Sequence, residues 1–71
     1  MSLADLKTGQ RAVVKDLRGD DFLKQQLQEM GFVPGSYVMV VSRSPFHGPL
    51  AVSVRGTVLG LRISEAECVQ V

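Results

Sequence analysis

The sequence has very few of the residues that carry redox, nucleophilic or metal chemistry. Its 71 residues include one cysteine (Cys68), one histidine (His47) and no tryptophan. A single cysteine excludes an internal disulfide and any CxxC metal or redox motif. Small domains without disulfides or metal clusters are typical of reducing compartments, so we expect a cytoplasmic protein whose apolar core alone holds the fold.

Long apolar runs and an excess of one charge are also missing. The longest apolar run, Tyr37 to Val41, is far shorter than the roughly 20 residues that cross a bilayer. An acidic residue, Asp5, stands where a signal peptide needs basic ones. Nucleic-acid binders usually carry a marked excess of Lys and Arg, whereas the formal net charge here is +1. We therefore expect neither secretion, membrane insertion nor a nucleic-acid partner.

The composition is that of one small folded domain. The hydrophobic fraction of 45% suffices for a single core, and the charged fraction of 21% is ordinary for a solvated surface. No linker, repeat or low-complexity tract divides the chain. We expect one domain over residues 1–71.

The first half predicts one strand and one helix. Gln10 to Leu17 is an expected strand centred on Val13 and Val14, and Gly19 ends it. Asp20 or Asp21 then caps a helix, because a carboxylate there accepts hydrogen bonds from free N–H groups. The apolar face of this helix consists of Leu23, Leu27 and Met30.

Glycines and prolines divide the second half into short strands. Gly31 is expected to end the helix, with Phe32 folding back onto its last turn. A type II turn is expected at Val33–Ser36, because Pro34 presets φ and Gly35 supplies a positive φ. The remaining elements are a strand at Tyr37–Ser42, a loop at Ser44–Pro49, an alternating strand at Leu50–Val54, a tight turn at Gly56, a strand at Thr57–Ile63, a capping box at Ser64–Glu67 that starts one helical turn, and a closing strand at Cys68–Val71.

This order predicts a mainly β fold. Small open sheets leave unpaired edges, which closure into a barrel removes. We expect a small SH3-like five-stranded barrel, with one α-helix inserted after the first strand and a short helical turn before the last strand.

Four segments resemble those of a known family. Leu27 to Gly35 reads LQEMGFVPG and resembles the L-x-x-M-G-[LF]-x-P-G signature of the FeoA family. The other three agree in order and spacing: the opening Leu6-x-x-Gly9, the loop Ser44-Pro45 to Pro49, and the tail Leu59-Gly60-Leu61-Arg62-x-x-Glu65-Ala66. The resemblance covers nearly the whole chain. It implies an SH3-like accessory protein of bacterial ferrous iron uptake.

The resemblance also implies a partner. FeoA proteins assist FeoB, a membrane Fe(II) transporter with a cytosolic G-protein domain. The implied role is docking on the cytosolic region of FeoB, with contact to the membrane only through that partner, as a monomer or weak homo-oligomer. It implies no enzymatic activity and no cofactor. From the residues themselves, a catalytic constellation and a phosphate-binding glycine loop are both missing.

Two segments compete as the binding surface. The motif residues Leu27, Met30, Gly31, Pro34 and Gly35 have structural explanations, since they finish an apolar helix face and form turns. The loop is the better candidate, with Arg43, Ser44, Pro45, Phe46 and His47 as partner-binding residues. Binding residues concentrate on loops held by rigid scaffolds. Phe46 is an exposed anchor in this interpretation; alternatively, it folds back over an open end of the barrel.

Two other functions stay open at this point. His47 and Cys68 are weak metal-ligand candidates for a metal-binding accessory or metallochaperone, although two ligands are fewer than a zinc site needs. The default for Cys68 is a buried apolar thiol. A nucleic-acid-binding barrel would use Arg43, Arg55 and Arg62 as a basic stripe, together with aromatic stacking residues.

Overall fold

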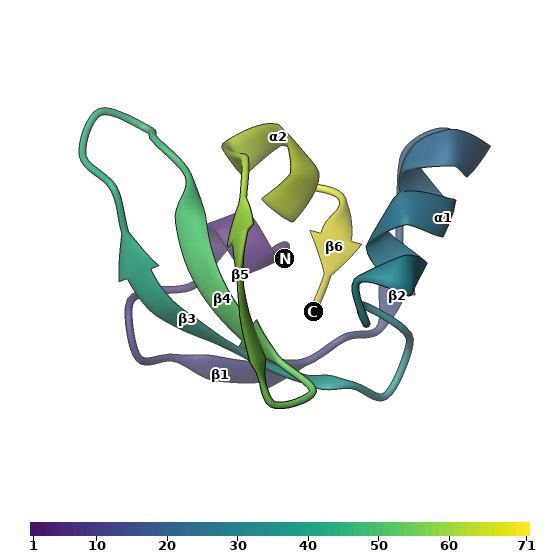
Figure 1. Cartoon of the computed structure of the whole chain (residues 1–71), viewed down its shortest axis with the longest axis horizontal. Helices are drawn as coiled ribbons and strands as arrows, with labels where there is room; N and C mark the ends of the chain where they lie inside the picture. The colour runs from purple at the N-terminus through teal and green to yellow at the C-terminus, as the bar shows by residue number, and fades with distance from the viewer.

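The computed structural model describes all residues 1–71 and contains six strands in two sheets (Figure 1). The elements in chain order are a 3₁₀ turn η1 (Leu3–Asp5), β1 (Arg11–Val13), β2 (Asp16–Leu17), α1 (Asp21–Glu29), β3 (Tyr37–Arg43), β4 (Leu50–Val54), β5 (Thr57–Leu61), α2 (Ile63–Ala66) and β6 (Val69–Gln70). The mainly β class is confirmed, with one helix among the early strands and a helical turn before the last strand.

The two sheets enclose one core. Four antiparallel strands form the larger sheet in the order β1-β3-β4-β5, and β2 pairs with β6 in the smaller one. In Figure 1 the larger sheet curves from the lower left to the centre, and α1 stands at the right beside the smaller sheet. The side chains with no exposed surface include Leu3, Leu27, Phe32, Val40, Val52, Leu61 and Val69.

The sequence predicts both ends of α1 correctly. Asp20 is the N-cap, and its side chain accepts a hydrogen bond from the Leu23 N–H at 2.8 Å. At the other end Gly31 has φ 106°, and Phe32 donates its N–H to the Leu27 carbonyl at 3.0 Å. This 6→1 bond defines a Schellman motif, which turns the Phe32 ring into the core. The following turn is also confirmed, because Ser36 donates to the Val33 carbonyl at 3.0 Å and Gly35 has φ 92°.

The single strand expected over Gln10–Leu17 is wrong, because the chain changes sheets in the middle. β1 pairs with β3 and ends at Val13; β2 begins at Asp16 and pairs with β6. Between them the Val14 side chain is buried, and its backbone bonds to Ser36 and Gly35, whereas the Lys15 N–H donates to Gln70. Tertiary pairing therefore divides a run that is continuous in β propensity, and the five expected strands become six.

The boundary after β5 also differs from the prediction. The strand stops at Leu61, and Ile63 opens α2 instead of continuing the alternation. The expected capping box at Ser64–Glu67 is wrong: the carboxylate that reaches back is that of Glu65, which accepts from the Arg62 N–H at 2.8 Å. Of the two hydrogen bonds of a capping box, only the one to the Glu65 carboxylate is present. The reciprocal bond would need an acceptor on the Arg62 side chain, and arginine has none.

Candidate functional site

The loop between β3 and β4 is a projecting hairpin end held by two backbone hydrogen bonds. Pro45 accepts a hydrogen bond from the Gly48 N–H at 3.1 Å, and Pro49 accepts one from Ser44 at 3.2 Å. Between them Phe46 and His47 both have positive φ, at 57° and 59°. Two successive residues with positive φ inside such a bond form a type I′ turn. Non-glycine residues adopt this conformation at a cost, so the two side chains are held in place by strained backbone.

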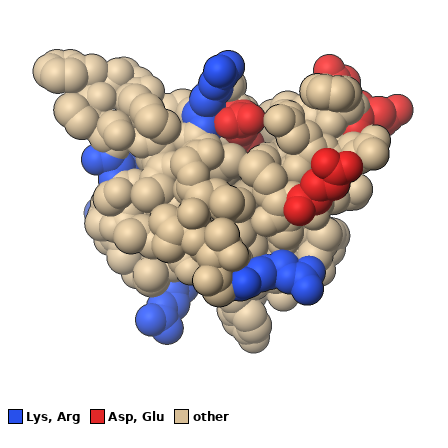
Figure 2. All heavy atoms as spheres, in the orientation of Figure 1, with Lys and Arg blue, Asp and Glu red and all other residues tan.

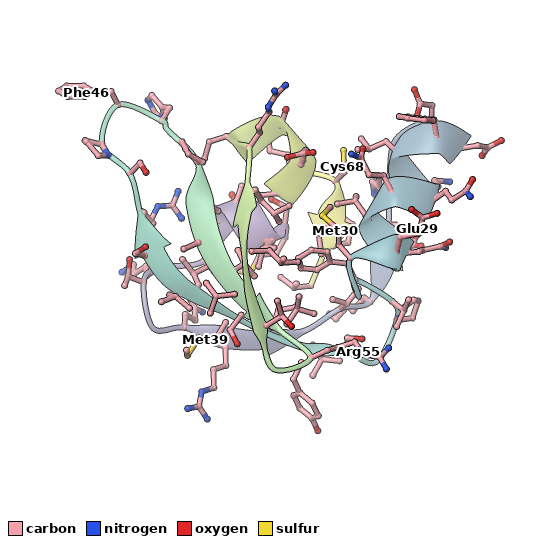
Figure 3. The ribbon with its side chains drawn as sticks, viewed as in Figure 1. Glu29, Met30, Met39, Phe46, Arg55 and Cys68 are labelled. Atoms are coloured by element: carbon pink, nitrogen blue, oxygen red, sulfur yellow. The ribbon has the colours of Figure 1, made fainter.

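Phe46 lies at the tip of this loop and covers nothing. Its side chain is 97% exposed. In Figure 3 it points away from the body of the domain at the far upper left. The sequence left two alternatives open for Phe46. In the structure its ring is exposed and does not fold back over the end of the barrel.

Arg43, at the end of β3, is held by the N-terminal segment. Its guanidinium donates from Nη1 to the Leu6 carbonyl at 2.6 Å and from Nη2 to the Ala4 carbonyl at 3.2 Å. The sequence predicted Arg43 as a partner-binding residue beside Phe46. The structure gives it a bracing role, which sequence spacing could not reveal because its acceptors are backbone atoms of a distant segment.

The three arginines of the expected basic stripe do not gather. In the sheet register Arg43 pairs with Leu50, and Leu50 pairs with Leu61, which precedes Arg62. Arg55 lies in the β4–β5 turn at the opposite end of the same strands. Figure 2 shows basic side chains scattered over this face, while acidic ones concentrate on the right, where α1 lies in Figure 1. The arrangement lacks the continuous basic track of a nucleic-acid groove.

The two weak metal-ligand candidates lie on different parts of the molecule. His47 is on the projecting loop, and Cys68 lies next to α2, where its thiol donates to the Ser64 carbonyl at 3.4 Å. The sequence predicted a buried apolar thiol; Cys68 packs against the core but is only partly buried. No three His, Cys, Asp or Glu side chains are grouped closely enough to hold a metal ion.

The motif residues occupy structural positions. Leu27 is fully buried, Met30 packs against the core from its edge, and the glycines hold the turns described above. Pro34 is exposed between them. The most recognisable segment of the sequence therefore builds the helix end and the turn into β3.

A groove that sequence reasoning missed runs between α1 and the β4–β5 hairpin. It has a volume of about 510 Å³ and is lined by residues 28–31 on one side and by Val54, Arg55, Thr57 and Leu59 on the other. Met30 and Arg55 mark its two sides in Figure 3. No sequence pattern indicates it, because its two sides come from segments far apart in the chain.

These features define a small SH3-like β-domain that presents a projecting loop and a groove. Comparison with protein families gives the same class a name. The FeoA domain model matches residues 1–71, and the chain belongs to this family, which acts in ferrous iron transport.

Solved structures of the family have the same fold. The crystal structure of zinc-complexed FeoA from Stenotrophomonas maltophilia, described as a procaryotic SH3 domain protein, is 38% identical with a TM-score of 0.85, covering 97% of this chain and 86% of that one. The solution structure of FeoA from Chlorobium tepidum is 31% identical with a TM-score of 0.89, covering 99% of this chain and 67% of that one. The expected SH3-like fold is confirmed.

One curated relative joins two proteins in a single chain. It is the Fe(2+) transport protein A/Fe(2+) transporter FeoB fusion protein of Porphyromonas gingivalis, 31% identical over 71 residues. The match covers 100% of this chain but only 8% of that protein. None of the helices in the present structure has the length and apolar character needed to cross a bilayer.

Proposed function

We propose that this domain is a cytosolic, non-catalytic accessory protein of bacterial ferrous iron uptake, which docks on the cytosolic region of the Fe(II) transporter FeoB and modulates it. Contact with the membrane comes only through that partner. The docking surface is the β3–β4 loop, with Phe46 as its anchor and Ser44, Pro45, His47 and Arg43 around it.

The observation that carries the proposal is the exposure of Phe46. An aromatic side chain that is 97% exposed on a hydrogen-bonded, proline-flanked turn has no role in the core. Aromatic anchors of this kind dominate many protein interfaces, and a preformed loop loses little conformational entropy on binding. The backbone strain at Phe46 and His47 is retained at a cost in stability, as is common at functional sites.

The fused relative supports the identity of the partner. In that protein a FeoA segment and FeoB share one polypeptide, which holds the two at high effective concentration.

The test is a binding measurement with the purified cytosolic region of the transporter from the same organism. The affinity is measured by calorimetry without nucleotide, with GDP and with a non-hydrolysable GTP analogue. We expect Phe46→Ala to weaken binding by about 10- to 100-fold, the range typical of a hot-spot aromatic. Circular dichroism checks that the variant remains folded.

Phe22→Ala is the matched control. Phe22 is also exposed, at 79%, but lies in the first turn of α1. Unchanged affinity in Phe22→Ala together with a loss in Phe46→Ala supports the loop as the anchor. Equal affinity in both variants and wild type places the interface elsewhere, and no binding by the wild-type domain refutes docking itself.

A further inference from the structure

β5 is an edge strand whose outward backbone groups are unpaired. The β4–β5 turn consists of Arg55 and Gly56, with φ 51° and 79°, which makes Val54 and Thr57 the hydrogen-bonded pair that closes the hairpin. Pairing alternates along an antiparallel ladder, so the N–H and C=O groups of Val58 and Gly60 point away from β4. No strand lies on that side, and no hydrogen bond of the loops or turns involves these groups.

This edge has no charged side chain, proline or bulge that would prevent pairing. Natural edge strands carry a lysine, a proline or a bulge that keeps other strands away. The segment Thr57-Val58-Leu59-Gly60-Leu61 has no charge and no proline, and its register with β4 is regular. Val58 is 60% exposed, and a side chain added at Gly60 would meet no atom within 4 Å. The edge is open to a further strand.

The groove beside β5 gives that strand an apolar floor. Leu59 and Met30 are half-buried on its two sides, and Val54 lies at the bottom. Arg55 sits at one mouth, packed so closely over Gly31 that a Cβ there would lie 3.0 Å from the arginine Cδ. A bound segment therefore meets backbone donors and acceptors along β5, an apolar surface below, the Arg55 cation at one end and the Glu29 carboxylate on the helix wall.

We infer that β5 binds an extended segment of the transporter's cytosolic region as an additional strand, with an apolar residue at alternate positions and a carboxylate beside Arg55. Main-chain hydrogen bonds to Val58 and Gly60 hold the segment, and the groove selects its side chains. This inference rests on the proposed function for the identity of the partner. It adds a second contact surface, at a different edge of the domain from Phe46.

A second copy of this chain fits the edge less well. The C-terminal end of α1 forms the opposite wall of the groove, so the β5 edge is recessed. In a symmetric pair each β5 edge would have to reach past the helix end of the other copy, whereas a single extended segment lies in the groove beside β5.

Amide hydrogen exchange tests the inference directly. The free domain and its complex with the purified cytosolic region of the transporter are compared by NMR. We expect the Val58 and Gly60 amides to exchange rapidly in the free domain and at least tenfold more slowly in the complex. A complex in which both amides exchange as in the free domain overturns the inference and leaves the proposed function standing. Failure of the wild-type domain to form any complex refutes both.

A pair of variants at Gly60 separates the backbone bond from side-chain effects. Gly60→Pro removes the outward N–H without touching the ladder to β4, and proline is tolerated at such edge positions. Gly60→Ala adds a side chain but keeps the N–H. We expect Gly60→Pro to weaken the complex at least fivefold relative to Gly60→Ala, with both variants monomeric in sedimentation. Equal affinities of the two variants contradict strand pairing at β5. A concentration-dependent dimer of the wild type that Gly60→Pro abolishes would instead assign the β5 edge to self-association.

If Gly60→Pro does not fold, Val58→Lys replaces it, because this variant places a charge on the exposed face of β5. We expect the same loss of affinity.

Discussion

The guanidinium of Arg43 is bonded to the backbone of Leu6, with its Nη1 atom 2.6 Å from the carbonyl oxygen. A second bond, 3.2 Å long, joins Nη2 to the Ala4 carbonyl. Arg43 ends β3, while Ala4 and Leu6 belong to the η1 turn and its C-cap. The side chain therefore ties the base of the projecting hairpin to the N-terminal segment, across 37 positions of sequence.

Replacing Arg43 tests this tie. Arg43→Met keeps an apolar stem but removes both donors, so we expect the free energy of unfolding to fall by about 1–3 kcal/mol, the range for hydrogen bonds from a charged group. Urea denaturation measures the loss. Arg11→Met, on exposed β1 with no side-chain hydrogen bond, is the control and should change stability by less than about 0.5 kcal/mol. Equal losses in both variants would contradict the bracing role.

A second pair of variants concerns the start of α1. Asp20→Ala deletes the acceptor for the Leu23 N–H, and we expect a loss of about 1 kcal/mol in the free energy of unfolding. Asp21→Ala removes the neighbouring charge without a capping bond and should lose about half as much, through the helix dipole alone. Thermal denaturation of the two variants side by side measures the difference. A larger loss in Asp21→Ala than in Asp20→Ala would contradict the assignment of Asp20 as the N-cap.

Local backbone chemistry made these features predictable from the sequence. Asp20, Gly31, Pro34 and Gly35 each act through the chain immediately beside them, so their roles follow from residue type and spacing. The division of the first strand does not, because it depends on Val14 being buried and Lys15 pairing with the last strand. Residue propensity contains no information on which of two sheets a strand joins.

The candidate surfaces divide in the same way. Phe46 could be singled out from its prolines and its loop, although only the folded structure decides that it is exposed. The bracing bonds of Arg43 and the groove along β5 arise from segments distant in sequence. Neither feature produces a pattern among residues that are close in the sequence, so sequence reasoning missed both.

Gly31 carries a testable steric constraint. Its φ of 106° suits glycine alone, and an added Cβ would lie 3.0 Å from the Arg55 Cδ. We expect Gly31→Ala to lower the free energy of unfolding by about 2 kcal/mol, from backbone strain together with displacement of Arg55. Gly9→Ala is the control, because Gly9 also has a positive φ, 85°, but no atom lies within 4 Å of an added Cβ. Urea denaturation should show a smaller loss of stability for Gly9→Ala than for Gly31→Ala. An equal loss would mean that the contact with Arg55 contributes nothing to the cost of Gly31→Ala.

Asp5 gives the domain a specific response to acid. The Ser2 N–H donates to its carboxylate at 2.8 Å, and this bond lowers the pKa of Asp5 below its ordinary value. Because the carboxyl group binds its proton less tightly in the folded state, the stabilisation is complete above the pKa of the unfolded chain and is lost as the pH falls through the folded value. Urea denaturation at pH 7 and pH 3 should therefore show a stability difference between wild type and Asp5→Asn that is smaller at pH 3 than at pH 7. A stability difference for Asp5→Asn that is as large at pH 3 as at pH 7 would contradict the mechanism.

Strain at the loop tip predicts opposite effects on stability and binding. Phe46 has φ 57°, a conformation that costs a non-glycine residue roughly 1–2 kcal/mol. Phe46→Gly removes this strain but gives the unfolded chain more freedom, so we expect a net gain of up to about 1 kcal/mol. Phe46→Ala keeps the strain and should leave the free energy of unfolding nearly unchanged, since the ring it removes is 97% exposed.

If Phe46 is the docking anchor, both variants lose affinity for the transporter's cytosolic region equally. Phe46→Gly then combines the higher unfolding temperature with the weaker complex. A Phe46→Gly variant that is less stable than Phe46→Ala would show that the turn is unstrained, and one that binds like wild type would remove the reason for retaining an aromatic residue at this position.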